Sequence, residues 1–160
     1  MTPAQLLTIK ADILANPDLV VAPLGSDGAD AIAKKYNAEA VPAFTVWKTS
    51  VSIREIGEAM NSTEVGGLTT ANSNRLMVMQ SYSDGFFNPS RADTRAGFDG
   101  VFGGAGGVLT RAALLVLYKR KATRLEKLFA LGTGTDPAPA TMAFEGLVTY
   151  GDIETARNLP

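Results

Sequence analysis

The 160-residue chain carries fifteen Lys and Arg against sixteen Asp and Glu, and it contains no cysteine and no histidine. This balance of charge excludes a global attraction to nucleic acid or to an anionic membrane, so any such contact has to be local. The lack of Cys and His removes disulfides, thiolate nucleophiles, the usual zinc sites and imidazole bases. We therefore expect a protein that is not an enzyme and that uses neither a cofactor nor a metal.

The N-terminal segment predicts an amphipathic helix. Thr2, Pro3 and Gln5 occupy the positions of a capping box with proline in the first turn, and Pro17 is expected to end the helix. Its apolar stripe consists of Leu6, Ile9, Ile13 and Leu14. Lys10 and Asp12 interrupt the apolar residues, a pattern that argues against a secretory signal, so we expect a protein made in the cytoplasm.

Residues 26–37 predict a second helix, capped by Ser26 or Asp27. The β-prone stretch that follows is broken by a proline, and we expect an extended connector there. Phe44 and Trp47 are its expected core anchors, because large aromatic side chains contribute most to burial.

Three more helices follow along the chain. Ser52 and Glu55 form a second capping box before a short helix that ends near Asn61. Further helices are expected from about Thr70 and from Ser90. In the first of these two helices Leu76, Met79 and Tyr82 recur at helical spacing. In the second, Phe98, Val101 and Phe102 are expected to point inward.

The glycine-rich sequence VFGGAGGVLTRAALLVLYKRKATRLEKL, residues 101–128, resembles a phosphate loop at first sight. A phosphate loop needs Lys followed by Ser or Thr after its last glycine, whereas Gly107 is followed by Val108 and Leu109. We expect the glycines to end one helix in a left-handed conformation and to turn the chain into the next. That next helix is predicted over about 108–130, with Leu114, Leu117, Leu125 and Leu128 on one face.

A basic cluster lies in the second half of this predicted helix. It consists of Lys119, Arg120, Lys121, Arg124 and Lys127. Cations here complement the helix dipole, and a solvated face is one interpretation. The other is contact with DNA phosphates or with an acidic neighbouring subunit. The longest apolar run, from Ala112 to Tyr118, is too short to cross a bilayer, so we expect no membrane contact.

The composition changes at Gly132. The stretch GTGTDPAPAT holds two glycines and two prolines and cannot continue a helix. We therefore predict a mainly α protein: a compact bundle of five or six helices over 1–131 and an extended, partly β arm over 132–160. Its expected contact residues are Met142, Phe144, Leu147, Val148 and Tyr150, with Asp152 capping a last helical turn. A hairpin folded back on the helices is the alternative.

Four segments resemble small structural proteins encoded in the head-gene modules of tailed bacteriophages and prophages. They are MTPAQLLTIKADILANP, YNAEAVPAFTVWKTSV, NPSRADTRAGFDGVFGGAGG and ATRLEKLFALGTGTDPAPATMAFEGLV, and together they extend over nearly the whole chain. The strings are distinctive but carry no chemical mechanism.

The resemblance implies a head-tail connector, or adaptor, that forms a ring under the portal in the neck of the virion. Its implied partners are other copies of itself, the portal protein, neighbouring neck or tail proteins and, nonspecifically, the packaged DNA. Head-completion and decoration proteins of the same gene neighbourhood are alternatives. A small regulatory domain that binds nucleic acid through the basic cluster is a third.

Overall fold

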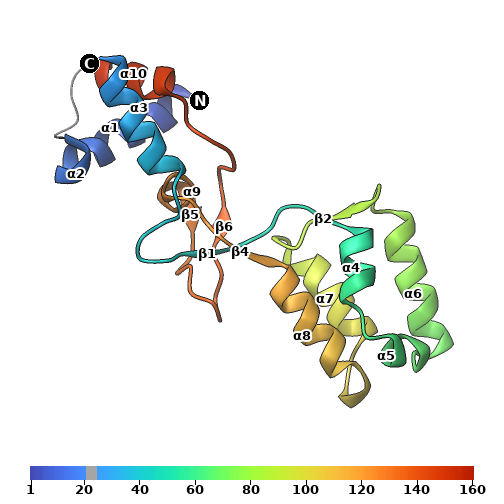
Figure 1. Ribbon diagram of the computed structural model, residues 1–160. Coiled ribbons are helices and arrows are strands. Elements are labelled where there is room, and N and C mark those ends of the chain that lie inside the picture. Colours follow the sequence, from blue (N-terminus) through green and yellow to red (C-terminus); the bar gives the residue numbers. More distant parts are fainter. Residues whose placement is uncertain (21–24) are drawn as a thin grey trace. The chain divides into compact units, whose positions relative to one another are not determined.

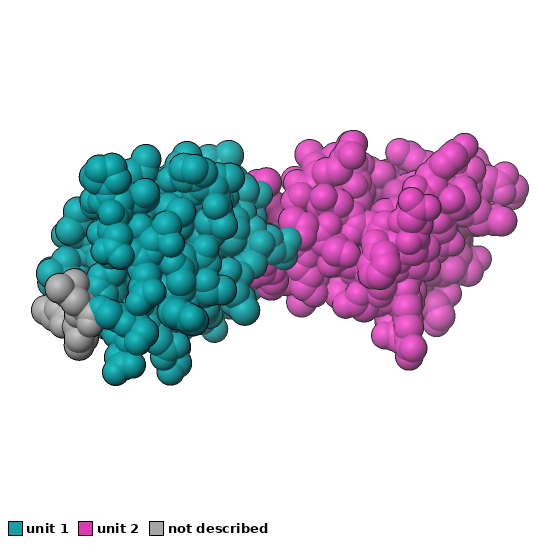
Figure 2. Space-filling view, turned by 90° about the horizontal axis from the view of Figure 1, so that it is seen from above, with its two compact units in different colours: residues 1–44, 121–131, 142–160 teal, residues 45–120, 132–141 magenta. Residues whose placement is uncertain are grey.

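The computed structural model describes residues 1–20 and 25–160 (Figure 1). Over these residues the chain is mainly helical, as predicted, but its ten α-helices and three small two-stranded sheets do not make one bundle of five or six helices. The chain divides into two compact units, coloured separately in Figure 2. Residues 1–44, 121–131 and 142–160 form unit 1, and residues 45–120 and 132–141 form unit 2. This division does not follow the predicted boundary between 131 and 132.

Unit 1 is a group of helices around one apolar core. Its helices are α1 (Pro3–Ala15), α2 (Pro17–Val20), α3 (Ser26–Asn37), α9 (Arg124–Phe129) and α10 (Tyr150–Asn158), with strand β5 (Ala130–Leu131). Helix α10 packs against α1 and α3 (Figure 1). The fully buried side chains at the centre are Ile9, Leu19, Ile32, Tyr36, Leu125 and Ile153.

The capping predictions in unit 1 are confirmed at α1 and wrong in detail elsewhere. Thr2 and Gln5 form the predicted capping box, each side chain accepting a hydrogen bond from the other's amide. Helix α3 starts at the predicted place, but Gly25 is its N-cap and no side chain caps it. At α10 the cap is Thr149, and Asp152 is the third helical residue that closes the box. The reason is positional, because the carboxylate at the third position reaches back to the amide of the cap.

Unit 2 is built from short helices and strands. These are β1 (Thr45–Trp47), β2 (Val51–Ser52), α4 (Ile53–Ala59), α5 (Ser62–Gly66), α6 (Thr70–Ser81), β3 (Phe86–Phe87), α7 (Ala92–Val101), the 3-10 helix η1 (Ala105–Gly107) and α8 (Val108–Leu117). Strands β2 and β3 are antiparallel, with Val51 opposite Phe87. Strand β4 (Lys119–Lys121) pairs with β1, and strand β6 (Thr141–Met142) pairs with β5. The division into units falls within β4 and within β6.

The predicted capping box of α4 is present, with Ser52 and Glu55 as its two members. The helix ends at Ala59, and Asn61 then caps α5, a short helix that the sequence analysis did not predict. Asn61 accepts hydrogen bonds from the amides of Thr63 and Glu64 through its side-chain oxygen. An asparagine cap is a common start signal, so the signal for α5 was in the sequence.

Most expected core residues of unit 2 are buried. Phe98, Val101 and Phe102 are each 1% exposed, and Leu76 is also buried. Tyr82 shares the helical spacing of Leu76 and Met79 but is 84% exposed and lies outside this core. In the connector, Trp47 packs at the edge of the core of unit 2, but the fully buried residue is Val46. Phe44 is half-buried in unit 1.

The long helix predicted over 108–130 is wrong. Helix α8 ends at Leu117, β4 follows, and α9 begins after Thr123, which forms a capping box with Glu126. The backbone between them is used for pairing, since Ala122 donates to the carbonyl of Phe44 at 2.9 Å. The leucine stripe is consequently divided: Leu114 and Leu117 belong to the core of unit 2, and Leu125 and Leu128 to the core of unit 1.

The segment from Gly132 is not one continuous arm. Residues 132–141 belong to unit 2, where Ala140 exchanges backbone hydrogen bonds of 3.0 Å with Thr45 and Trp47. Residues 142–160 belong to unit 1, in whose core Val148 and Ile153 are buried. Extended backbone with glycine and proline can satisfy its polar groups by pairing with a strand, and this pairing is why the predicted linker packs here.

Candidate functional site

The structure separates the predicted basic cluster. Lys119 and Arg120 lie on β4 in unit 2, whereas Lys121, Arg124 and Lys127 belong to unit 1, the last two on α9. Lys119 pairs with Asp136 at 3.2 Å, and its side chain is 12% exposed. The ammonium of Lys127 lies 5.6 Å from the centre of the Phe44 ring. One helical face therefore does not carry the five cations.

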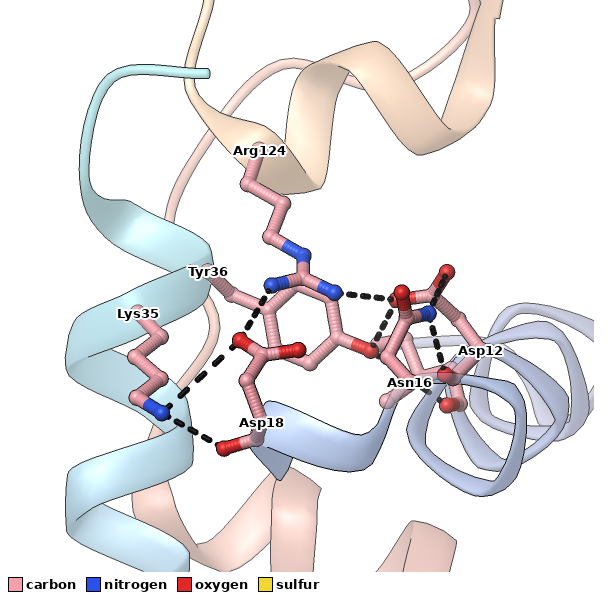
Figure 3. Close-up of polar contacts among 7 residues, drawn as sticks. Asp12, Asn16, Asp18, Lys35, Tyr36 and Arg124 are labelled. Atoms are coloured by element: carbon pink, nitrogen blue, oxygen red, sulfur yellow. Dashed lines mark hydrogen bonds and ion pairs between the residues drawn. The ribbon is translucent and has the colours of Figure 1, made fainter. Parts of the chain in front are cut away.

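Arg124 is the centre of a polar cluster in unit 1, shown in Figure 3. One guanidinium nitrogen lies 2.9 Å from the carboxylate of Asp18, and another lies 3.5 Å from that of Asp12. The guanidinium carbon also lies 5.5 Å from the centre of the Tyr36 ring. Arginine suits this position because its planar fork can pair with carboxylates while its face stacks on an aromatic ring. Its partners come from α1, α2 and α3.

Tyr36 supplies the buried part of this cluster. The side chain is fully buried, and its hydroxyl donates a hydrogen bond of 2.7 Å to Asp12. Asn16 donates to the other carboxylate oxygen of Asp12 at 2.9 Å. Burial, followed by the contact with Asp12, raises the pKa of the Tyr36 hydroxyl far above its usual range. The phenol therefore stays protonated and acts as a donor.

Asp18 completes the cluster on its exposed side. The hydrogen bond from Arg124 holds the pKa of Asp18 below its usual range. Lys35 lies 3.7 Å from the same carboxylate and donates a 2.5 Å hydrogen bond to the backbone carbonyl of Asp18. These bonds join α2 to α3 and to α9 (Figure 3).

A hollow of about 770 Å³ adjoins the cluster, and residues of unit 1 alone line it. Its charged lining is balanced, with three carboxylates and three cations: Asp12, Asp18, Glu39, Lys35, Arg124 and Lys127. Because these charges balance, and because Lys35 and Arg124 pair with Asp12 and Asp18, the lining gives no preference for a ligand of either sign. Within the described residues no group of three acidic side chains could hold a metal ion. The arrangement joins four helices, α1, α2, α3 and α9.

The N-terminus of α8 answers the question raised by the glycine loop. Its amides at Leu109 and Thr110 donate to the carboxylate of Glu64 at 2.9 and 2.7 Å. An anion at these amides is what a phosphate loop would supply, and here the chain supplies it. Desolvation works against ionisation of Glu64, but the bonds from Thr110 and Leu109 outweigh it and lower the pKa.

The glycines turn the chain between α7 and α8, as predicted, but Phe102 and not a glycine is the C-cap of α7. Gly104 has a φ of 72°, in the left-handed region, and is the N-cap of η1. A Cβ on Gly107 would lie 2.1 Å from the carbonyl oxygen of Phe102, so no larger residue fits there without movement. The loop therefore turns α7 into α8 by a close backbone approach.

The predicted arm residues differ in their exposure. Val148 is buried in the core of unit 1, and Phe144 packs against that core beside Phe129, with ring centres 5.7 Å apart. Leu147 and Tyr150 are exposed, and Met142 is half-buried. Only part of this set is thus available to a partner in the folded chain, and its role in assembly stays a prediction.

No single helix in the described part of the chain is long and apolar enough to cross a membrane. The helices 92–101 and 105–117 would pass such a test of length and composition only together, and they meet at 115°. Both also contribute to the core of unit 2, through Phe98, Val101 and Leu114.

The roles of Asp12, Asp18 and Tyr36 in the cluster were not predicted from the sequence. The sequence shows Asp12 only as a charge in an apolar segment, although a carboxylate facing a core is costly unless it is paired. That signal predicts a buried partner but cannot say which residue supplies it.

In comparisons with known proteins, no family model, no curated protein and no solved structure matches this chain.

Proposed function

We propose that this protein is a structural component of a tailed-bacteriophage virion, a head-tail connector that forms a ring of copies in the neck. The resemblance of four segments to phage head-module proteins suggests the class. The structural observation that supports it is an apolar helix face left uncovered in unit 2, since large exposed apolar patches are typical of protein interfaces.

This face, which we call the α8 face, consists of Val108, Leu109, Ala112, Leu115 and Val116. The five positions recur at intervals of three and four, so they form one stripe along the helix. All five are exposed, Val116 to 73%, while the opposite side of α8 buries Thr110 and Leu114. None of the five carries a charge, so a second apolar surface is the complementary partner.

We propose that a second copy of the chain covers the α8 face. In a ring each copy meets two neighbours through unlike surfaces, so the α8 face of one copy would meet another apolar patch of the next. Unit 1 exposes apolar side chains of its own, among them Leu7, Leu14 and Leu147. Portal and tail proteins would then contact the remaining surface of the ring.

The proposal is tested on assembled particles. Mass spectrometry of purified virions should find the protein, and a density map of the neck should show it as a ring between portal and tail. Val116→Asp should fold, by circular dichroism, yet be lost from the ring. Val41→Asp, which places the same charge on a 92% exposed apolar residue of unit 1, is the matched control and should still assemble.

Other results would favour a function other than a head-tail connector. A map that places the protein on the capsid surface would favour a decoration protein. Salt-dependent binding of the monomeric chain to duplex DNA, with no protein in virions, would favour the nucleic-acid-binding alternative. The paired state of Lys119 and Arg124 weighs against that alternative, because their carboxylate partners neutralise charge that DNA contact would require.

A further inference from the structure

A second pocket, of about 110 Å³, lies within unit 2. Trp47, Phe98 and Leu114 are among its apolar walls. Its polar lining consists of Arg95, Arg111, Tyr118 and Asp99. The pocket is distinct from the polar cluster of unit 1, and the inference drawn from it does not rest on the proposed function.

One hydrogen-bond donor in this lining lacks an acceptor. The hydroxyl of Tyr118 is buried and has no hydrogen-bond partner among the described residues, and the whole residue is 3% exposed. A buried donor without a partner is costly, so such groups usually mark a missing ligand, ion or water. Burial, and then the charge of Asp99, raises the pKa of Tyr118 well above its usual range, so the hydroxyl remains a donor.

The two arginines are also incompletely used. Arg95 donates through one terminal nitrogen to the carbonyls of Pro89 and Ser90, at 2.5 and 3.1 Å. Arg111 likewise uses one terminal nitrogen, toward the carbonyls of Phe102 and Gly104. Within the described chain neither guanidinium forms an ion pair, although the charge of Arg111 helps to lower the pKa of Glu64. A planar arginine fork suits the bidentate binding of a carboxylate.

Asp99 is the one acidic residue of the lining, and it does not satisfy these donors. Its carboxylate forms no ion pair with Arg95 or Arg111 and accepts no hydrogen bond from Tyr118. Two guanidinium charges against one carboxylate give the lining residues an excess of one positive charge, which the Glu64 carboxylate offsets in part because it interacts electrostatically with Arg111. Arg95 is held in place by Trp47, with its guanidinium carbon 4.1 Å from the ring centre.

The geometry points to a binding site for a carboxylate on a short hydrocarbon stem. The carboxylate would accept hydrogen bonds from the unused nitrogens of Arg95 and Arg111 and from the hydroxyl of Tyr118. The stem would lie against the apolar walls, which a fully hydrated oxyanion such as phosphate would not favour. A pocket of this size admits a carboxylate with a few methylene groups.

Trp47 provides a direct readout, because it is the only tryptophan of the chain and it lines the pocket. Butyrate titrated into the full-length protein at low concentration should change the Trp47 fluorescence in a saturable way and raise the melting temperature. Butyramide has the same shape without the charge and should have little effect. Inorganic phosphate should also bind more weakly than butyrate.

Two variants test whether butyrate binds in this pocket. Tyr118→Phe removes only the unpartnered hydroxyl and should weaken butyrate binding by about tenfold or more, since hydrogen bonds to charged groups are strong. Arg95→Gln should weaken it similarly. Arg91→Gln is the matched control: it removes one positive charge just before α7, from a residue that pairs with Asp93 and does not line the pocket, and it should leave binding unchanged.

A free metabolite and an Asp or Glu side chain of a second copy carry the same carboxylate chemistry. Sedimentation at rising protein concentration separates them: self-association that butyrate reverses and Tyr118→Phe weakens assigns the pocket to a second copy. Saturable butyrate binding by a protein that stays monomeric assigns it to a small molecule. The inference is overturned if butyrate neither binds nor changes self-association, which would leave a water-filled pocket only. It is also overturned if butyramide or phosphate binds as well as butyrate.

Discussion

The hydroxyl of Tyr36 donates a 2.7 Å hydrogen bond to the carboxylate of Asp12. The other deeply buried tyrosine hydroxyl, that of Tyr118, has no acceptor among the described residues. The same substitution at the two positions therefore separates a satisfied hydroxyl from an unsatisfied one.

Tyr36→Phe is expected to lower the free energy of unfolding by about 1.5 to 3 kcal/mol, because it removes a buried hydrogen bond to a charged group. Tyr118→Phe should change it by less than about 0.5 kcal/mol, or stabilise the protein slightly, because no bond is lost. Urea unfolding followed by circular dichroism measures both. Equal losses at the two positions would mean that Tyr118 has an acceptor after all.

Gly107→Ala should destabilise unit 2 by about 1 to 3 kcal/mol, since the added Cβ would lie against the carbonyl of Phe102 and force the backbone to move. Gly106→Ala is the control in the same turn, because its added Cβ would meet nothing within 4 Å. The thermal unfolding curves of the two variants give the comparison. A tolerated alanine at 107 would contradict the close approach of α7 to α8.

Ile153→Ala should cost about 2 to 5 kcal/mol, because Ile153 is 0% exposed in the core of unit 1. Leu147→Ala, in the same C-terminal segment but 68% exposed, should cost less than about 0.5 kcal/mol. Denaturant unfolding distinguishes the two. Were both changes neutral, residues 142–160 would behave as the independent arm that the sequence predicted.

Thr149→Ala should cost about 1 kcal/mol, because Thr149 caps α10 in a reciprocal box with Asp152. Thr155, within the same helix, bonds only to the carbonyl one turn before it, and Thr155→Ala should be neutral or slightly stabilising. Helix content and melting temperature of the two variants test the assignment. A larger effect at 155 than at 149 would place the start of α10 elsewhere.

Glu64→Gln should lower the melting temperature of the protein near neutral pH and have little effect in acid. The folded state lowers the pKa of Glu64 through the amides of Leu109 and Thr110, while the unfolded chain returns it to its ordinary value of 4.5. The contribution of the charge is thus complete above that ordinary value and is lost as the pH falls through the lower pKa of the folded state. Melting curves of both proteins from neutral to acidic pH should converge.

Local signals in the sequence predicted the starts of several elements correctly. The capping boxes at Thr2 and Ser52 and the glycine turn before α8 need only residues within a few positions of one another. Helices over 26–37 and from Thr70 followed from periodicity in the same way. Such signals are reliable because backbone donors at a helix start must be satisfied nearby.

The long helix predicted over 108–130 is wrong because periodicity along the chain does not say which core a residue faces. Leu114 and Leu125 repeat with helical spacing, so the sequence alone could not reveal that each faces a different core. The Thr123 and Glu126 box was a local signal for a new helix, but the apolar periodicity around it concealed the break. Backbone pairing of Ala122 with Phe44, far away in the chain, makes the interruption stable.

The sequence by itself determined the mainly helical character, most helix starts and the lack of thiol, imidazole and phosphate-loop chemistry, because these depend on residue type and on neighbours along the chain. Only the tertiary structure decided the two units, the burial of residues 142–160 and the pairing of Arg124 with Asp12 and Asp18. These depend on contacts between residues far apart in the chain, such as the bond from Arg124 to Asp18, 106 positions away, and the bond from Asn37 to Val148, 111 positions away. Such contacts leave no period in the sequence, since their energy comes from packing and charge pairing in three dimensions.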